Sequence, residues 1–130
     1  MKEVLLIFGG IYGTLAVIFG AFGAHALKKT LDTAQLKSFE TGVKYQMYHA
    51  LLLIILGITF PFLEFSQVVM GWCFILGIFL FSFSIYGLVL SSSRGNKLKF
   101  LGPITPLGGL FLVVGWILFT VNAVKYAAFF

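Results

Sequence analysis

The chain has 130 residues, of which 60% are hydrophobic and 10% are charged, and its formal net charge is +5. A soluble domain has about half apolar and about a quarter charged residues, so this composition excludes a globule covered by water-facing charges. The charge is too small and too divided among loops to indicate a nucleic-acid partner. The single cysteine, Cys73, excludes an intramolecular disulfide, a redox pair and a thiolate zinc site.

Four stretches without Asp, Glu, Lys or Arg dominate the sequence. A helix that crosses a hydrocarbon core of ~30 Å takes roughly 20 residues, and each stretch is long enough for one. The two-residue alternation typical of a transmembrane barrel is absent. We therefore predict an all-α, four-helix transmembrane bundle that forms one domain over residues 1–130. The expected spans are about 4–27, 45–62, 67–91 and 105–126.

The first span carries small residues at intervals of three or four, which places them on one helical face. Gly9, Gly13 and Gly20 belong to this face. Small residues let a second helix approach closely within a membrane. We expect the face to pack against another span of the same chain, and the seam of a homo-oligomer is the alternative.

A short amphipathic segment, Asp32–Gly42, follows the first span. Asp32 and Gln35 have the spacing of a capping box, which opens a helix. Apolar and charged side chains fall on opposite faces of the segment, as is typical of a helix lying on a membrane surface. We predict a short cytoplasmic surface helix that Gly42 ends before the second span begins.

Two histidines lie near the same predicted membrane edge. His25 precedes Lys28 by three residues, and His49 follows Lys44 by five. At about 1.5 Å per residue, both imidazoles lie at a similar depth below the flanking lysines. We expect the two side chains to meet in one leaflet, because polar groups within membranes usually face a bundle interior or a wet cavity.

Further polar residues are expected to join the histidines. Tyr45 and Gln46 lie four and three residues before His49, on the same helical face. The last span is expected to begin in this leaflet, with Thr105 as its N-cap and Pro106 in its first turn, and its unpaired N–H groups favour anions. The approach over residues 102–106 is expected to be buried. The predicted site for a lipid headgroup or small ligand comprises His25, His49, Tyr45, Gln46 and Thr105, with Lys28, Lys44 and Arg94 at its rim.

Three other interpretations of this polar cluster stay open. The residues could form a structural hydrogen-bond cluster, the histidines could ligate haem or another metal, or one histidine could be catalytic. No catalytic triad, zinc-protease motif or pair of buried carboxylates accompanies them, so we expect a non-enzymatic protein with no cofactor, metal or catalytic residue. A role in membrane assembly is one form that such a non-enzymatic function could take. An oligomeric transporter or channel, a haem-binding protein and an intramembrane enzyme are the alternatives.

Lysine and arginine are distributed unequally between the two sides of the predicted bundle. The stretches 28–44 and 92–100 carry seven of the nine, and only Lys2 and Lys125 lie on the other side. The positive-inside rule therefore places both basic stretches in the cytoplasm and both termini outside. Eight lysines against one arginine, with many Phe and Ile, favour a bacterial plasma membrane. Membrane lipids are the expected partners, and a membrane-protein partner is an alternative.

Four motifs occur in order along nearly the whole chain: GAFGAHAL (20–27), FETGVKYQMYHAL (39–51), LGPITPLGG (101–109) and Gly115-Trp116. Together they resemble the family of domain of unknown function 423, which includes YgdD/YwdK-like small membrane proteins and a eukaryotic transmembrane protein 256 group. The resemblance implies a four-helix membrane protein. It implies no reaction, substrate or cofactor, and it places the predicted site residues within stretches that the family shares.

Overall fold

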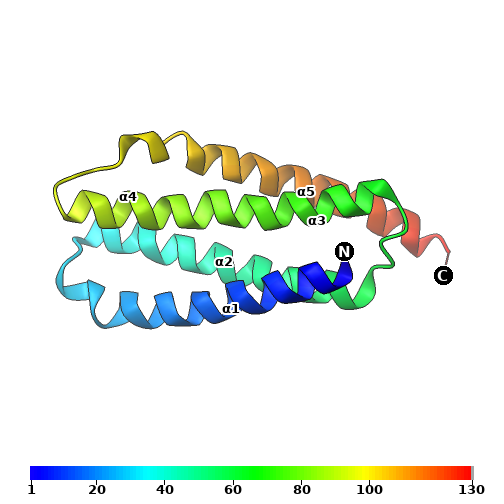
Figure 1. The fold of residues 1–130 in the computed structure, drawn as a ribbon, viewed down its shortest axis with the longest axis horizontal. Coiled ribbons are helices and arrows are strands. Elements are labelled where there is room, and N and C mark those ends of the chain that lie inside the picture. Colours follow the sequence, from blue (N-terminus) through cyan, green and yellow to red (C-terminus); the bar gives the residue numbers. More distant parts are fainter. Residues whose placement is uncertain (130) are drawn as a thin grey trace.

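The computed structural model of the chain describes residues 1–129 and consists of helices joined by short loops (Figure 1). Within these residues, four helical columns are long and apolar enough to cross a membrane, so the predicted four-helix bundle is confirmed. The third column contains a π-helical turn, η2, between two α-helices, and two short 3₁₀ turns, η1 and η3, lie in the loops. The elements are α1 (Lys2–Ala24), η1 (Leu27–Lys29), α2 (Thr33–Thr59), α3 (Phe65–Ile78), η2 (Phe79–Phe83), α4 (Ser84–Ser93), η3 (Lys99–Leu101) and α5 (Ile104–Ala127).

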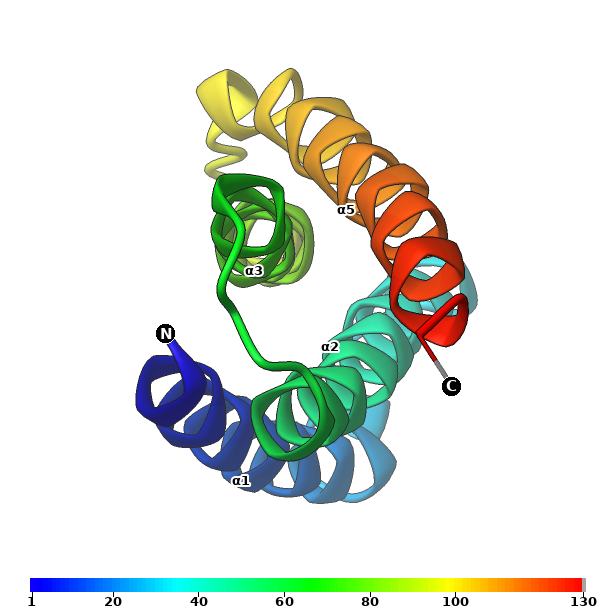
Figure 2. The same cartoon turned by 90° about the vertical axis from the view of Figure 1, so that its right-hand side faces the viewer.

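The columns lie side by side along the length of the molecule (Figure 1). One end, which we call the terminal end, carries the start of α1, the end of α5 and the loop over residues 60–64. The opposite end, the basic end, carries the loops over residues 25–32 and 94–103. Viewed end-on, α1, α2 and α5 form a curved wall, and the column of α3 and α4 lies on its concave side (Figure 2).

The segment predicted as a separate surface helix is instead the beginning of α2, which runs without a break. The predicted capping box is confirmed: Asp32 Oδ1 accepts the Gln35 N–H at 2.7 Å, and Gln35 Oε1 accepts the Asp32 N–H at 3.1 Å. Gly42 does not end the helix. It gives room to the ring of Tyr86, since a Cβ at this position would lie 2.7 Å from Tyr86 Cε1. This packing offsets the cost of a helical glycine, about 1 kcal/mol relative to alanine.

α2 is longer than a hydrocarbon core is thick. Its 27 residues extend for roughly 40 Å, compared with ~30 Å for the core. The charged residues Lys37, Glu40 and Lys44 all lie in its first four turns, and residues 45–62 carry no charge. The first turns of α2 therefore extend past the hydrocarbon at the basic end.

The small residues of α1 face α2 of the same chain. A Cβ added to Gly9 would lie 2.7 Å from Ile54 Cγ1, and one added to Gly20 would lie 3.5 Å from Val43 Cγ1. Gly13 lies between them on the same face. A homo-oligomer through these three glycines would therefore require α2 to move away.

α5 makes its closest approach at the π-helical turn. A Cβ on Gly108 would collide with the backbone of Leu80 and Phe81, so only glycine fits at this crossing. On the other side of the turn, Ser82 Oγ donates to the Gly42 carbonyl of α2 at 2.8 Å. The widened turn therefore contacts both neighbouring helices.

The beginning of α5 differs from the prediction. The helix starts at Ile104 with Pro103 at the N-cap, so Thr105 does not cap it. Thr105 lies inside the first turn, and its hydroxyl is 2.6 Å from Ser84 Oγ of α4. Gly102 and Pro103 are exposed, whereas the approach was expected to be buried. Leu101, just before them, still packs against Gly87 of α4.

We expect Gly108→Ala to lower the free energy of unfolding by about 1–3 kcal/mol, the range of an overpacked site, because its methyl group meets backbone that cannot rotate away. Thermal unfolding in a mild detergent measures this change. Gly109→Ala is the matched control, since its Cβ would lie 3.8 Å from Phe81, at ordinary contact distance. Equal unfolding temperatures for the two variants would contradict the close crossing.

Candidate functional site

Gln46 lies inward, as expected, and its amide joins three helical columns. The side chain is fully buried. Its Nε2 donates to the Tyr12 carbonyl of α1 at 2.8 Å, and its Oε1 accepts the Tyr86 hydroxyl of α4 at 2.7 Å. The Tyr12 hydroxyl in turn donates to the Ile75 carbonyl of α3 at 2.9 Å. This network connects the helices of the bundle. It uses the amide oxygen of Gln46 and one of its two amide hydrogens.

His49 lies on α2 and is buried against α5, where Trp116 contacts it. Its Nδ1 lies 2.7 Å from the Tyr45 carbonyl, and its Nε2 lies 3.1 Å from Trp116 Nε1. An indole N–H only donates, so Nε2 must accept and Nδ1 must carry the proton. The Tyr45 side chain was expected to point inward, but it is 43% exposed.

The structure does not bring His25 and His49 together. His25 is the exposed residue that follows α1, and Gly23, two residues earlier, packs against Phe39. Phe39 precedes His49 by ten residues, which places the two histidines about 15 Å apart along the bundle. The expectation of equal depth was wrong because it took Lys44 as the start of the second helix, and α2 begins much earlier. A bis-histidine site for haem does not form in this arrangement.

The other residues of the predicted site are also separated. Thr105 pairs with Ser84, and Lys28, Lys44 and Arg94 are exposed toward the basic end. Within residues 1–129, no three side chains of His, Cys, Asp or Glu converge as metal ligands would. The predicted site residues therefore divide into three hydrogen-bonded groups, around Gln46, His49 and Thr105, and a set of exposed residues toward the basic end.

A cavity of about 370 Å³ lies between α1, α2 and α4 toward the basic end. Aromatic and aliphatic side chains form most of its wall. Arg94 is its single charged residue and lies exposed at the end of α4. An apolar interior beside a cation suits an alkyl chain that bears an anionic group. The lining residues are Phe19, Phe22, Leu27, Phe39, Phe83, Tyr86, Leu90 and Arg94.

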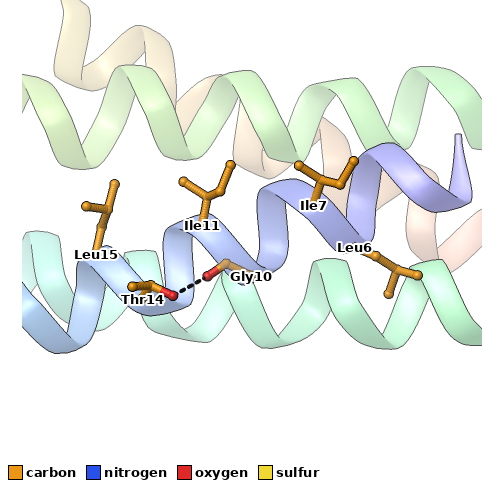
Figure 3. A pocket seen from close by; sticks show the side chains of 6 residues that line it. All are labelled: Leu6, Ile7, Gly10, Ile11, Thr14 and Leu15. Carbon is orange, nitrogen blue, oxygen red and sulfur yellow. Dashed lines mark hydrogen bonds between the residues drawn. The ribbon is translucent and has the colours of Figure 1, made fainter.

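α1 also forms a shallow hollow by itself (Figure 3). The only side-chain hydrogen bond there joins Thr14 Oγ1 to the Gly10 carbonyl at 2.8 Å. Because the Thr14 hydroxyl is hydrogen-bonded within the helix and the other side chains of the hollow are apolar, we assign no site to this surface. The lining residues are Leu6, Ile7, Gly10, Ile11, Thr14 and Leu15.

Sequence reasoning missed the partners that fix Gln46 and His49. Tyr12, Tyr86 and Trp116 each combine a large apolar ring with one polar atom, and such residues usually find a hydrogen-bond partner when buried. Their position within charge-free spans was a usable signal. It could not identify which polar group each ring contacts, because that depends on the register between helices.

Comparison with known proteins relates this chain to a family model and to similar membrane proteins. The family model described as "Protein of unknown function (DUF423)" matches residues 19–109. The UPF0382 membrane protein YwdK of Bacillus subtilis (strain 168) is 42% identical over 126 residues, covering 95% of this chain and 98% of that protein. UPF0382 membrane proteins of Staphylococcus aureus (strain bovine RF122 / ET3-1) and Staphylococcus haemolyticus (strain JCSC1435) are 37% and 36% identical, covering 96% and 95% of this chain and 98% of each protein. No solved structure matches the chain.

We expect Tyr86→Phe to lower the free energy of unfolding by about 1 kcal/mol, because it leaves the buried Gln46 Oε1 without a donor. Denaturation in mixed micelles measures the change. Tyr48→Phe is the control, since the Tyr48 side chain is 60% exposed and its hydroxyl makes no hydrogen bond within residues 1–129. If both variants lose the same stability, the amide bridge contributes nothing specific.

The hydrogen bonds of His49 predict its tautomer. Nitrogen-15 spectra of the labelled protein in micelles should show a protonated Nδ1 and an acceptor Nε2. Trp116→Phe should shift the Nε2 resonance, because its donor is lost, and should leave the Nδ1 resonance in place. A spectrum with the proton on Nε2 would contradict the contact between Trp116 and His49.

Proposed function

Because the chain belongs to the DUF423 family of proteins of unknown function, and similar relatives are named membrane proteins, we propose a specific function for it within the membrane. We propose that this integral membrane protein is non-enzymatic and binds an anionic lipid at its basic end. The aromatic cavity beside Arg94 is the observation that carries the proposal. The cavity would hold part of one acyl chain, and the arginine would contact the phosphate.

The charge of the basic end supports an anionic ligand. Seven basic and two acidic side chains belong to this end, and two of each belong to the terminal end. The basic end therefore carries the whole formal net positive charge of the chain. Each lysine or arginine near an anionic membrane surface contributes about 1 kcal/mol of attraction. The acidic residues do not neutralise Arg94, since no acid lies within ion-pair distance of it in residues 1–129.

The same charges support an orientation in the membrane. The positive-inside rule would place the basic end on the cytoplasmic side of a bacterial plasma membrane and both termini outside. The cavity would then face the cytoplasmic leaflet, whose anionic lipids it suits. The projecting first turns of α2 would lie among the headgroups, near the level of the cavity wall at Phe39.

The interior of the bundle favours lipid binding over catalysis or transport. Among residues 1–129, no buried side-chain nitrogen or oxygen lacks a hydrogen-bond partner. Catalytic groups and transport paths need polar atoms that a substrate can reach. Here the polar atoms that a ligand can reach lie at the ends of the bundle.

Native mass spectrometry of protein released from nanodiscs tests the lipid proposal. The discs contain equal amounts of phosphatidylglycerol and phosphatidylcholine. We expect the wild type to retain phosphatidylglycerol preferentially. Arg94→Gln should reduce this retention about fivefold, which corresponds to the ~1 kcal/mol contributed by one interfacial cation.

Two further variants separate the cavity from general charge. Leu27→Trp fills the cavity and leaves every cation in place, so it should also reduce retention of phosphatidylglycerol. Lys2→Gln removes a cation from the terminal end and should have no effect. Unchanged retention in both Arg94→Gln and Leu27→Trp would overturn the proposal.

A further inference from the structure

A second pocket lies at the terminal end, where a tight loop joins α2 to α3. Phe62 in this loop has a φ of 55°, which is uncommon for a bulky residue. The turn brings two successive N–H groups onto one side chain of α3. Gln67 Oε1 accepts the Leu63 N–H at 2.9 Å and the Glu64 N–H at 3.5 Å. These two donors fix which end of the amide is oxygen, so Nε2 faces elsewhere.

The Nε2 group of Gln67 is an unused donor. The side chain belongs to a residue that is only 6% exposed. Within residues 1–129, Nε2 has no hydrogen-bond partner, and Gln67 lines a pocket of about 320 Å³. No buried side-chain nitrogen or oxygen in residues 1–129 lacks a hydrogen-bond partner, so this Nε2 atom is open to the pocket that Gln67 lines. It is therefore a free donor to which an acceptor atom of a ligand in the pocket can bind.

Opposite charges lie at the rim of this pocket. Glu64 Oε2 and Lys125 Nζ are 3.6 Å apart, and both side chains are more than half exposed. Asn122 is a further polar residue of the wall, and its Oδ1 accepts the Ser66 hydroxyl at 2.8 Å. The pocket thus offers a carboxylate, an ammonium and an amide donor together. This set differs from the cavity at the basic end, where Arg94 is the single charged residue of the lining.

We propose that this terminal-end pocket binds a zwitterionic group that carries a primary ammonium and a phosphate, as phosphoethanolamine does. The ligand ammonium donates to the Glu64 carboxylate. The ligand phosphate contacts the Lys125 ammonium and accepts from Gln67 Nε2. The ligand charges thus complement the rim, and the unused amide hydrogen gains an acceptor.

Exposed apolar side chains around the pocket favour a lipid as the source of this group. Leu63 and Phe129 line the pocket and are each 87% exposed, and Phe65, the first residue of α3, is 82% exposed. Large apolar side chains at the end of a transmembrane bundle lie in the interface between headgroups and acyl chains. A phosphatidylethanolamine headgroup would meet the pocket at this depth.

Lipid retention from nanodiscs with equal phosphatidylethanolamine and phosphatidylcholine tests the proposal. Both lipids are zwitterions, but only the first has an ammonium N–H to donate. We expect the wild-type protein to retain phosphatidylethanolamine about tenfold over phosphatidylcholine, the range of one hydrogen bond to a charged group. Glu64→Gln should abolish the preference between the two lipids. Equal retention of both lipids by the wild type would overturn the proposal.

Gln67→Glu is the sharpest variant, because it keeps an oxygen for the two backbone N–H groups and removes the amide donor. It should weaken retention of phosphatidylethanolamine about tenfold. Gln35→Glu is its matched control: Gln35 occupies the same capping position in α2, at the basic end. Thermal unfolding of both variants checks that each still folds. If the two folded variants retain the lipid alike, Gln67 does not contact it and the proposal fails.

Competition with free phosphoethanolamine distinguishes the two sources of the ligand. Displacement of the lipid by the free compound supports the pocket chemistry and assigns it to the small molecule as well. Lipid retention that survives an excess of free phosphoethanolamine, but is lost in Gln67→Glu, supports the headgroup alone. Loss of phosphatidylglycerol in Arg94→Gln is independent of these outcomes, because Arg94 lies at the other end of the bundle.

Discussion

The side-chain amide of Gln46 joins α1, α2 and α4 at one point inside the bundle. Without it, the Tyr12 carbonyl would keep only its helical bond and the Tyr86 hydroxyl would have no acceptor on α2. Helices in a membrane gain little from burying apolar surface against one another, because lipid tails are equally apolar. Directional bonds and close backbone contacts must therefore select the arrangement. Gln46 supplies the bonds, and Gly9 and Gly108 supply the contacts.

Within residues 1–129, every buried side-chain nitrogen and oxygen of the interior already has a hydrogen-bond partner. His49 has both ring nitrogens engaged, and Gln46 is enclosed by its tyrosines. Polar atoms that a ligand could reach occur where the helices end. The basic end combines Arg94 with an aromatic cavity, and the terminal end combines Gln67 with an ion pair. The two ends therefore differ in the charge they present to the two leaflets.

The fold was predictable because charge-free length is a strong signal, and the capping box at Asp32 was predictable because its residues are local. The continuous course of α2 through Gly42 was not, since its cause is the Tyr86 ring, forty-four residues away along the chain. The pairing of the histidines failed for a related reason. Depth counted from the nearest lysine is valid only where the helix begins at that lysine, and at Lys44 it does not. Contacts between helices depend on register, which a single sequence does not contain.

The charged first turns of α2 have a mechanical consequence for the bundle as a whole. Lys37, Glu40 and Lys44 cannot enter the hydrocarbon, and neither can Glu64, which lies in the loop after α2 at the terminal end. The charged residues at the two ends therefore prevent the bundle from moving along the membrane normal. In a membrane of different thickness, hydrophobic mismatch would then be absorbed by tilting or by local bending of the lipid. The protein is thus matched to a bilayer about as thick as the uncharged part of α2, residues 45–59.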